Sequence, residues 1–158
     1  MSDASKREVI KALNAFLKGE HMAIRSYDEF VHNVQDHSIK KELARIQQEH
    51  KQHAADIARR IQELGGKPQE STGLAGIMAW AMMEVAEITG QTDLDIVKRA
   101  LEGEDLGIKS AAKVVEGDLD PVSEKLVRQI LSADQAHLGA LRELINTYEN
   151  SICCDGSN

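Results

Sequence analysis

The sequence predicts an all-α fold, a single bundle of four long helices, on three observations. Only 3% of the 158 residues are aromatic and two are proline, whereas Ala, Leu, Ile, Lys, Glu and Gln dominate a composition that favours helix. Apolar residues recur every three or four positions through four long segments, which is the period of an amphipathic helix. Turn residues separate these segments, and a chain of this length can bury one apolar core without disulfides.

The first two helices are predicted to form a hairpin. Residues 5–34 and 39–64 carry continuous apolar stripes, separated by a short polar turn. Ser38 is the expected N-cap of the second helix, and the pair Gly65-Gly66, followed closely by Pro68, ends it. Because so few residues join them, these two helices must be antiparallel neighbours.

A second hairpin follows the same logic. The third helix starts near Thr92, with Asp95 three residues on as a capping-box partner, and it ends at Gly117. The pair Asp120-Pro121 marks the start of the fourth helix, because it offers an N-cap followed by proline at the first helical position. This helix is expected to continue to about Asn150.

The connection between the hairpins, residues 65–91, is long enough for the chain to cross the bundle. Within it, the apolar segment 74–88 is expected to form a short helix. The same segment is the expected contact of a small homo-oligomer, a dimer in solution. Residues 1–150 are therefore predicted to form one domain, and residues 151–158 a flexible C-terminal tail.

The charge and the apolar pattern exclude several classes of protein. A formal net charge of −7 argues against a nucleic-acid partner, which would need a clustered basic face. Residues 74–88 are too few for a membrane span, and they include the charged Glu84. The polar N-terminus does not have the pattern of a secretory signal. A cytoplasmic protein without a membrane partner is therefore expected. Cys153 and Cys154 are neighbours and provide neither a disulfide framework nor zinc-site spacing.

Near its middle, the apolar stripe of every predicted helix is interrupted by acidic or histidine side chains. These are Glu20, His50, His53, Glu104, Asp134 and His137. Burying unpaired carboxylates costs several kcal/mol each, and no Lys or Arg lies on the stripes at that level. A metal ion or protonated histidines would supply the missing positive charge. Carboxylate and imidazole ligands suit Fe, Mn or Zn, and a hydrogen-bonded polar core without metal is the alternative.

The spacing within two of the helices supports a metal site. His50 with His53, and Asp134 with His137, are three residues apart, so each pair faces the same way and can converge on one point. Inward carboxylates combined with histidines at this spacing are typical of di-iron helical bundles.

Over nearly the whole chain, these segments resemble the ferritin-like superfamily. Residues 20–23 with Tyr27 resemble the first ligand helix of rubrerythrins, whereas residues 50–56 resemble the second ligand helix of bacterioferritins. Residues 104–109 and 130–137 are similar to the third and fourth ligand helices of bacterioferritins. The closest resemblance is to a bacterial ferritin-like four-helix-bundle family of unknown function. Three segments carry that likeness: residues 17–20, 64–66 and 101–105.

The resemblance implies a ferritin-like four-helix bundle with a metal centre. It assigns four terminal ligands, the carboxylates of Glu20 and Glu104 and the imidazoles of His53 and His137. At the two positions where bridging glutamates are usual, this chain has His50 and Asp134. An imidazole cannot bridge as a carboxylate does and Asp is one methylene shorter. An asymmetric or mononuclear centre is therefore expected at least as much as a symmetric di-iron centre. Glu49, one position off the stripe, is a further candidate ligand.

The resemblance also implies a function. Iron is the expected metal, with Mn and Zn as alternatives, in a ferroxidase or peroxide-linked redox reaction that uses O2 or peroxide. No haem is expected, because Lys51 stands where the bacterioferritin haem ligand would require Met. The rival hypothesis is a non-enzymatic bundle in a stress or scaffolding role, with structural zinc or a metal-free polar core. The fold alone does not decide between them.

Overall fold

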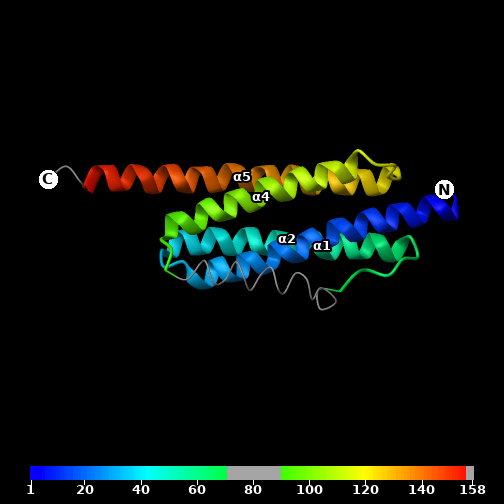
Figure 1. Cartoon of the computed structure of the whole chain (residues 1–158), viewed down its shortest axis with the longest axis horizontal. Helices are drawn as coiled ribbons and strands as arrows, with labels where there is room; N and C mark the ends of the chain where they lie inside the picture. The colour runs from blue at the N-terminus through cyan, green and yellow to red at the C-terminus, as the bar shows by residue number, and fades with distance from the viewer. Residues whose placement is uncertain (71–89, 156–158) are drawn as a thin grey trace.

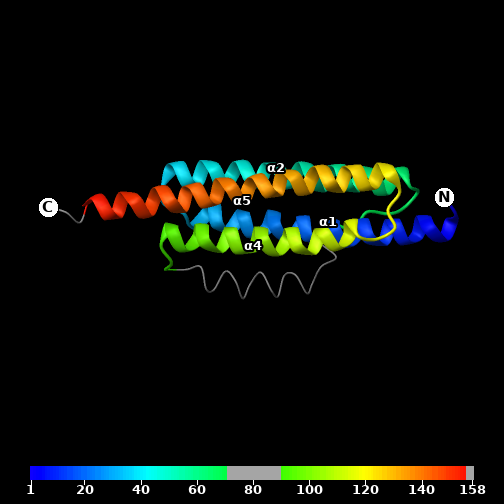
Figure 2. The same ribbon diagram turned by 90° about the horizontal axis from the view of Figure 1, so that it is seen from above.

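Four helices form an all-α bundle, as the sequence predicts, in the computed structural model, which describes residues 1–70 and 90–155. They are α1 (Asp3–Asn33), α2 (His37–Glu63), α4 (Asp93–Val115) and α5 (Pro121–Asp155). The helices lie side by side along one axis, with the two ends of the chain at opposite ends of the bundle (Figures 1 and 2). Helix α1 packs against α2 and α4, and α5 packs against α4 and α2. Among the described helices, none is long and apolar enough to cross a membrane.

The connectivity is that of two antiparallel hairpins, α1–α2 and α4–α5. Figure 1 shows that α2 ends and α4 begins at opposite ends of the bundle, which confirms the predicted long crossover between the hairpins. The short helix predicted for residues 74–88, and the dimer contact expected there, lie outside the described residues.

The helix ends follow the predicted caps in part. Thr92 and Asp95 form the expected capping box at the start of α4. At the start of α2 the predicted N-cap, Ser38, is wrong: the carboxylate of Asp36 accepts hydrogen bonds from the backbone N–H groups of Ser38 and Ile39, at 2.8 and 2.9 Å. The charged carboxylate satisfies two free N–H groups and complements the helix dipole, so it starts the helix earlier.

The last helix is longer than predicted. Helix α5 continues to Asp155, five residues beyond the expected end near Asn150. No glycine or proline lies between Gly139 and Gly156, so the sequence contains no residue that would break the helix before that point.

Two apolar clusters fill the interior of the bundle. Cluster I comprises Tyr27, Phe30, Val34, Ile39, Leu43, Ile46, Ile96, Val97, Ala100 and Leu141. Cluster II comprises Val9, Leu13, Phe16, Leu17, Ala54, Ile57, Ile61, Ala111, Val127 and Ile130. Along α2, cluster I ends at Ile46 and cluster II begins at Ala54. The residues between these two positions therefore lie in a separate layer at mid-height.

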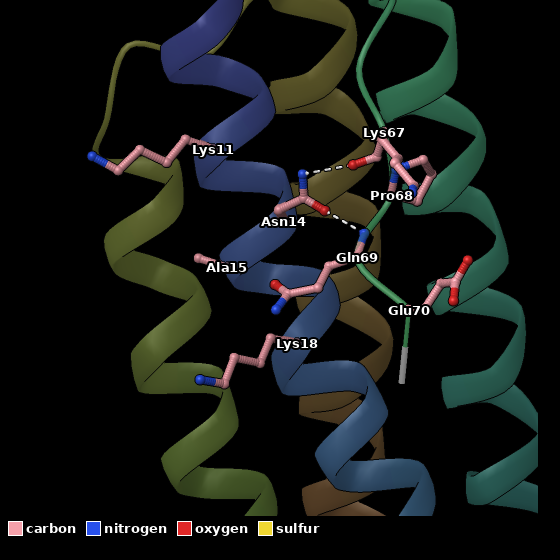
Figure 3. Close-up of a pocket in the computed structure, with 8 residues that line it drawn as sticks. All are labelled: Lys11, Asn14, Ala15, Lys18, Lys67, Pro68, Gln69 and Glu70. Carbon is pink, nitrogen blue, oxygen red and sulfur yellow. Dashed lines mark hydrogen bonds between the residues drawn. The ribbon is translucent and has the colours of Figure 1, made fainter. Parts of the chain in front are cut away.

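The chain that leaves α2 is anchored to α1. Gly65 has a positive φ of 81°, the left-handed conformation that commonly ends a helix. The side-chain amide of Asn14 then donates a hydrogen bond to the carbonyl of Lys67 and accepts one from the N–H of Gln69 (Figure 3). These bonds hold the start of the crossover against the first helix.

Candidate metal centre

The six predicted polar residues form one cluster between apolar clusters I and II. Helix α1 contributes Glu20, α2 contributes His50 and His53, α4 contributes Glu104, and α5 contributes Asp134 and His137. All are buried except His53, whose side chain is 11% exposed. Their potential ligand atoms form two overlapping groups in which all atoms lie within 4.8 Å of one another. The groups share His50 and Asp134; one adds Glu20 and His53, and the other adds Glu104 and His137.

His50 lies at the centre of the cluster and connects two carboxylates. Its Nδ1 donates a hydrogen bond to Oε2 of Glu20, and its Nε2 donates one to Oε1 of Glu104, both at 2.8 Å. Burial by itself would lower the pKa of His50, but the two carboxylates outweigh burial and raise this pKa to about 10. His50 therefore brings a positive charge into the buried layer.

Glu104 is held as a carboxylate by donors from other helices. Its Oε1 also accepts a hydrogen bond from the hydroxyl of Tyr27, at 2.7 Å. Burial would raise the pKa of Glu104, but contacts with His137, His50 and Tyr27 lower it to about 2. Burial, reinforced by the charge of Glu104, raises the pKa of Tyr27 well above its ordinary value, so Tyr27 stays a donor.

The sequence resemblance places Tyr27 in the first ligand helix but does not predict this contact with Glu104. A signal was present, because Tyr27 follows Glu20 by seven residues and so lies on the same helix face, two turns further on. A buried tyrosine usually finds a partner for its hydroxyl.

Asp134 lies between the two terminal histidines. Its Oδ1 is 3.4 Å from Nδ1 of His53 and 3.7 Å from Nδ1 of His137. All three atoms are buried and have no hydrogen-bond partner within the described part of the chain. Burial, together with the negative charge of Glu20, raises the pKa of Asp134 to about 7. Buried polar atoms are rarely left unpaired, so a cation or protons are needed at this point.

His137 is oriented from outside the cluster by Glu49. The Nε2 of His137 donates a hydrogen bond to Oε2 of Glu49, at 2.7 Å. Its Nδ1 faces the interior, 3.5 Å from Oε1 of Glu104 and 3.7 Å from Oδ1 of Asp134. The side chain of Glu49 is 39% exposed and also pairs with Arg45. Glu49, predicted as a further candidate ligand, thus contacts the outer nitrogen of His137 and is in neither of the two groups. Outer carboxylates of this kind commonly fix the tautomer of a metal-binding histidine.

A cavity of about 490 Å³ between α1 and α4 reaches the carboxylate side of the cluster. Four cluster residues line it: Glu20, His50, Glu104 and Asp134. Its walls include Gly19, Gly103 and Gly107, where an added methyl group would meet no described atom within 4 Å. A second hollow, of about 780 Å³, lies against α1 and includes Lys11, Lys18 and Lys67 (Figure 3). None of the cluster residues lines this second hollow.

The bundle, with acidic and imidazole side chains from all four described helices meeting at mid-height, defines a ferritin-like four-helix-bundle protein. The chain belongs to the DUF2383 family, described as a domain of unknown function, whose model matches residues 8–117. No functionally curated protein matches the sequence.

Solved structures have the same fold. A dodecameric thioferritin, the bacterioferritin-related protein from Bacteroides fragilis, is 19% identical with a TM-score of 0.76, over 97% of this chain and 92% of that one. Desulfovibrio desulfuricans bacterioferritin is 24% identical with a TM-score of 0.73, over 93% of this chain and 83% of that one.

A two-domain protein from Anabaena variabilis, with DJ-1/ThiJ/PfpI-like and ferritin-like domains, is 16% identical with a TM-score of 0.74. The match covers 92% of this chain but only 38% of the Anabaena protein. At these identities the three likenesses establish the fold.

Proposed function

We propose that this protein binds iron in the cluster between apolar clusters I and II and acts as a ferroxidase or peroxide-linked redox protein. One observation carries the proposal: Oδ1 of Asp134 lies 3.4 and 3.7 Å from Nδ1 of His53 and Nδ1 of His137, and these three buried atoms have no hydrogen-bond partner in the described chain. Carboxylate and imidazole donors suit Fe, Mn and Zn. The di-iron site of D. desulfuricans bacterioferritin, which has the same fold, supports iron among these metals.

Each cluster residue has a role in this proposal. Asp134 would hold metal either with Glu20 and His53 or with Glu104 and His137, because its carboxylate belongs to both groups of close donor atoms. Tyr27 would position Glu104, and Glu49 would position His137, through the hydrogen bonds described above. Bound iron would supply one-electron chemistry toward O2 or peroxide. The cavity between α1 and α4 supports access by a small oxidant, because it reaches the carboxylates from outside.

Metal analysis and iron oxidation test the proposal together. The protein is purified without added metal, and its Fe, Mn and Zn contents are measured. Fe(II) is then added in air, and oxidation is followed by the ferric absorbance. We expect iron in a fixed ratio to protein and oxidation faster than in buffer. Bound zinc, or no metal, without faster oxidation would overturn the proposal.

Substitution of ligands tests the residue assignment. We expect Glu20→Ala and His53→Ala to lose bound metal, because each removes a donor from the cluster. His32→Ala is the control, since His32 is exposed on α1 and lies outside both ligand groups. Full metal content and unchanged stability in both cluster variants would show that the assignment is wrong.

A second candidate function is a non-enzymatic bundle in a stress or scaffolding role, with structural zinc or a metal-free core. The contacts of His50 favour it, because this side chain already offsets part of the charge of Glu20 and Glu104. Under this alternative, the metal analysis would find zinc or no metal, and iron would not be oxidised faster than in buffer.

A further inference from the structure

We infer that Arg45, which lies outside the cluster, is a positioning residue of the proposed metal site, because it holds the carboxylate of Glu49 against His137. The inference rests on the proposed metal binding and adds a residue to it. The contacts form one series, from Glu42 through Arg45 to Glu49 along α2 and then across to His137 on α5.

The two ring nitrogens of His137 face opposite sides of the site. Nε2 lies 2.7 Å from Oε2 of Glu49, on the outer side. Nδ1 lies 3.5 Å from Oε1 of Glu104 and 3.7 Å from Oδ1 of Asp134, inside the cluster. Rotation of the ring would break the outer hydrogen bond, so this bond determines where Nδ1 lies. Outer hydrogen-bond partners commonly orient metal-binding histidines in this way.

Glu49 is not fixed by burial, because its side chain is 39% exposed. A glutamate with this exposure has several rotamers within reach and can exchange a hydrogen bond for water. Both of its carboxylate oxygens have protein partners, however. Oε2 contacts His137, whereas Oε1 accepts a hydrogen bond from Nη1 of Arg45, four residues earlier on the same helix. The contact with Arg45 therefore restricts the carboxylate to the position that faces His137.

Arg45 is itself oriented by Glu42, three residues earlier. Its Nε lies 3.0 and 3.1 Å from the two oxygens of Glu42, and its Nη2 lies 2.6 Å from Oε1. Because the guanidinium group is a rigid planar fork, the side bound to Glu42 leaves Nη1 directed at Glu49. Exposed ion pairs add little to folding stability, so we expect this network to act on the position of His137.

The charge of Arg45 and its geometry have opposite effects on a bound cation. A positive charge near the cluster repels a metal ion, so by charge alone the loss of Arg45 would strengthen metal binding. If Arg45 positions Glu49, its loss weakens metal binding instead. Arg45→Lys separates the two effects, because lysine keeps the charge but has no planar fork that can contact both glutamates.

Equilibrium dialysis against Mn(II) measures the effect. Metal-free full-length proteins are dialysed over a range of Mn(II) concentrations, and bound metal is determined by elemental analysis. We expect about tenfold weaker binding for Glu49→Gln, the direct partner of His137, and about threefold weaker binding for Arg45→Lys, one contact further out. Arg59→Lys is the matched control and should bind like the wild-type protein. Arg59 pairs with Asp56 on the same helix, and neither residue is in a ligand group.

The double variant Arg45→Lys/Glu49→Gln tests whether Arg45 acts through Glu49. We expect it to bind Mn(II) as weakly as Glu49→Gln alone, because the two substitutions interrupt the same series of contacts. A further loss of affinity in the double variant would refute this path.

Urea unfolding of the metal-free proteins separates positioning from a general structural role. We expect Arg45→Lys to unfold at the urea concentration of the wild-type protein, whereas a loss of stability that accounts for the weaker binding would overturn the inference. Wild-type or stronger Mn(II) affinity in Arg45→Lys would also overturn it and leave the proposed metal binding intact. No Mn(II) binding by the wild-type protein would overturn both.

Discussion

At the scale of single residues, Glu104 shows how a buried carboxylate is made tolerable. It is 5% exposed, and its Oε1 accepts hydrogen bonds from Tyr27 on α1 and His50 on α2. Hydrogen bonds to a charged group contribute more than bonds between neutral groups, and they replace the water that the carboxylate loses on folding. These contacts also connect three helices at one point, so they determine where the carboxylate lies relative to the histidines.

Removal of the tyrosine hydroxyl tests this role. We expect Tyr27→Phe to lower the free energy of unfolding of the metal-free protein by about 1.5 to 3 kcal/mol, because Glu104 loses a buried donor. Urea unfolding followed by circular dichroism measures the change. Tyr148→Phe is the matched control: Tyr148 is a half-buried tyrosine that packs against cluster I, and its change should stay within about 0.5 kcal/mol. Equal losses in the two variants would contradict the prediction.

At the scale of the helix, Asp120 joins the start of α5 to α2. Its Oδ1 accepts hydrogen bonds from the N–H groups of Val122 and Ser123, at 3.1 and 3.2 Å. The same oxygen accepts one from Nη2 of Arg60 at 2.8 Å, and the hydroxyl of the fully buried Ser123 donates to Oδ2. One carboxylate therefore caps a helix and pairs with a guanidinium on the neighbouring helix.

The stability that Asp120 provides should depend on pH. Burial would raise its pKa, but the hydrogen bonds from Ser123 and the charge of Arg60 outweigh burial and lower it. The folded protein thus binds the carboxyl proton of Asp120 more weakly than the unfolded chain does. The contribution of the carboxylate is complete above the ordinary aspartate pKa of about 4, and it is lost as the pH falls through the lower pKa of the folded state.

The comparison of wild-type protein with Asp120→Asn measures this contribution. We expect the wild-type protein to be more stable by about 1 to 3 kcal/mol at pH 7, with a difference that shrinks as the pH falls below about 4. Denaturant unfolding of both proteins at pH 7, 5 and 3 measures this difference in the free energy of unfolding. Asp118→Asn, at an exposed position two residues earlier, should change stability by less than about 0.5 kcal/mol throughout. A difference that does not vary with pH would rule out the ionised carboxylate as its source.

At the scale of the whole molecule, the polar layer divides one bundle into two apolar clusters. Ile46 in cluster I and Ile57 in cluster II lie on the same helix and are fully buried, with His50 and His53 between them. Apolar side chains on opposite sides of the polar layer belong to different clusters, although the same helices run through both clusters. The two clusters should therefore contribute independently to a common unfolding transition.

Paired isoleucine substitutions test that independence. Ile46→Val and Ile57→Val should each cost about 0.5 to 1.5 kcal/mol, and the double variant should equal their sum within about 0.5 kcal/mol. Ile57→Val combined with Ile61→Val serves as the comparison, because these residues are one turn apart within cluster II and are expected to couple. Strong coupling across the polar layer would show that the clusters form one packing unit.

Much of this architecture is readable from the sequence. The three-four spacing of apolar residues predicts four helices, and the capping box at Thr92 and the Asp120-Pro121 start are local signals that the structure confirms. The polar interruptions in the stripes predict which side chains enter the core, because an α-helix turns by the same angle at every residue. The choice of Asp36 over Ser38 as N-cap was not predictable in this way, since both residues are good caps and neighbouring contacts decide between them.

The spacing of residues along the chain is enough to predict which side chains face the interior, because their direction depends only on the period of one helix. The pairing of these side chains is a property of the folded bundle. In it, His50 spans Glu20 and Glu104, Tyr27 donates to Glu104, and Glu49 contacts the outer nitrogen of His137. These contacts depend on the axial shift between helices and on side-chain rotamers. Both are set by the packing of residues far apart in the chain, so no local pattern carries them.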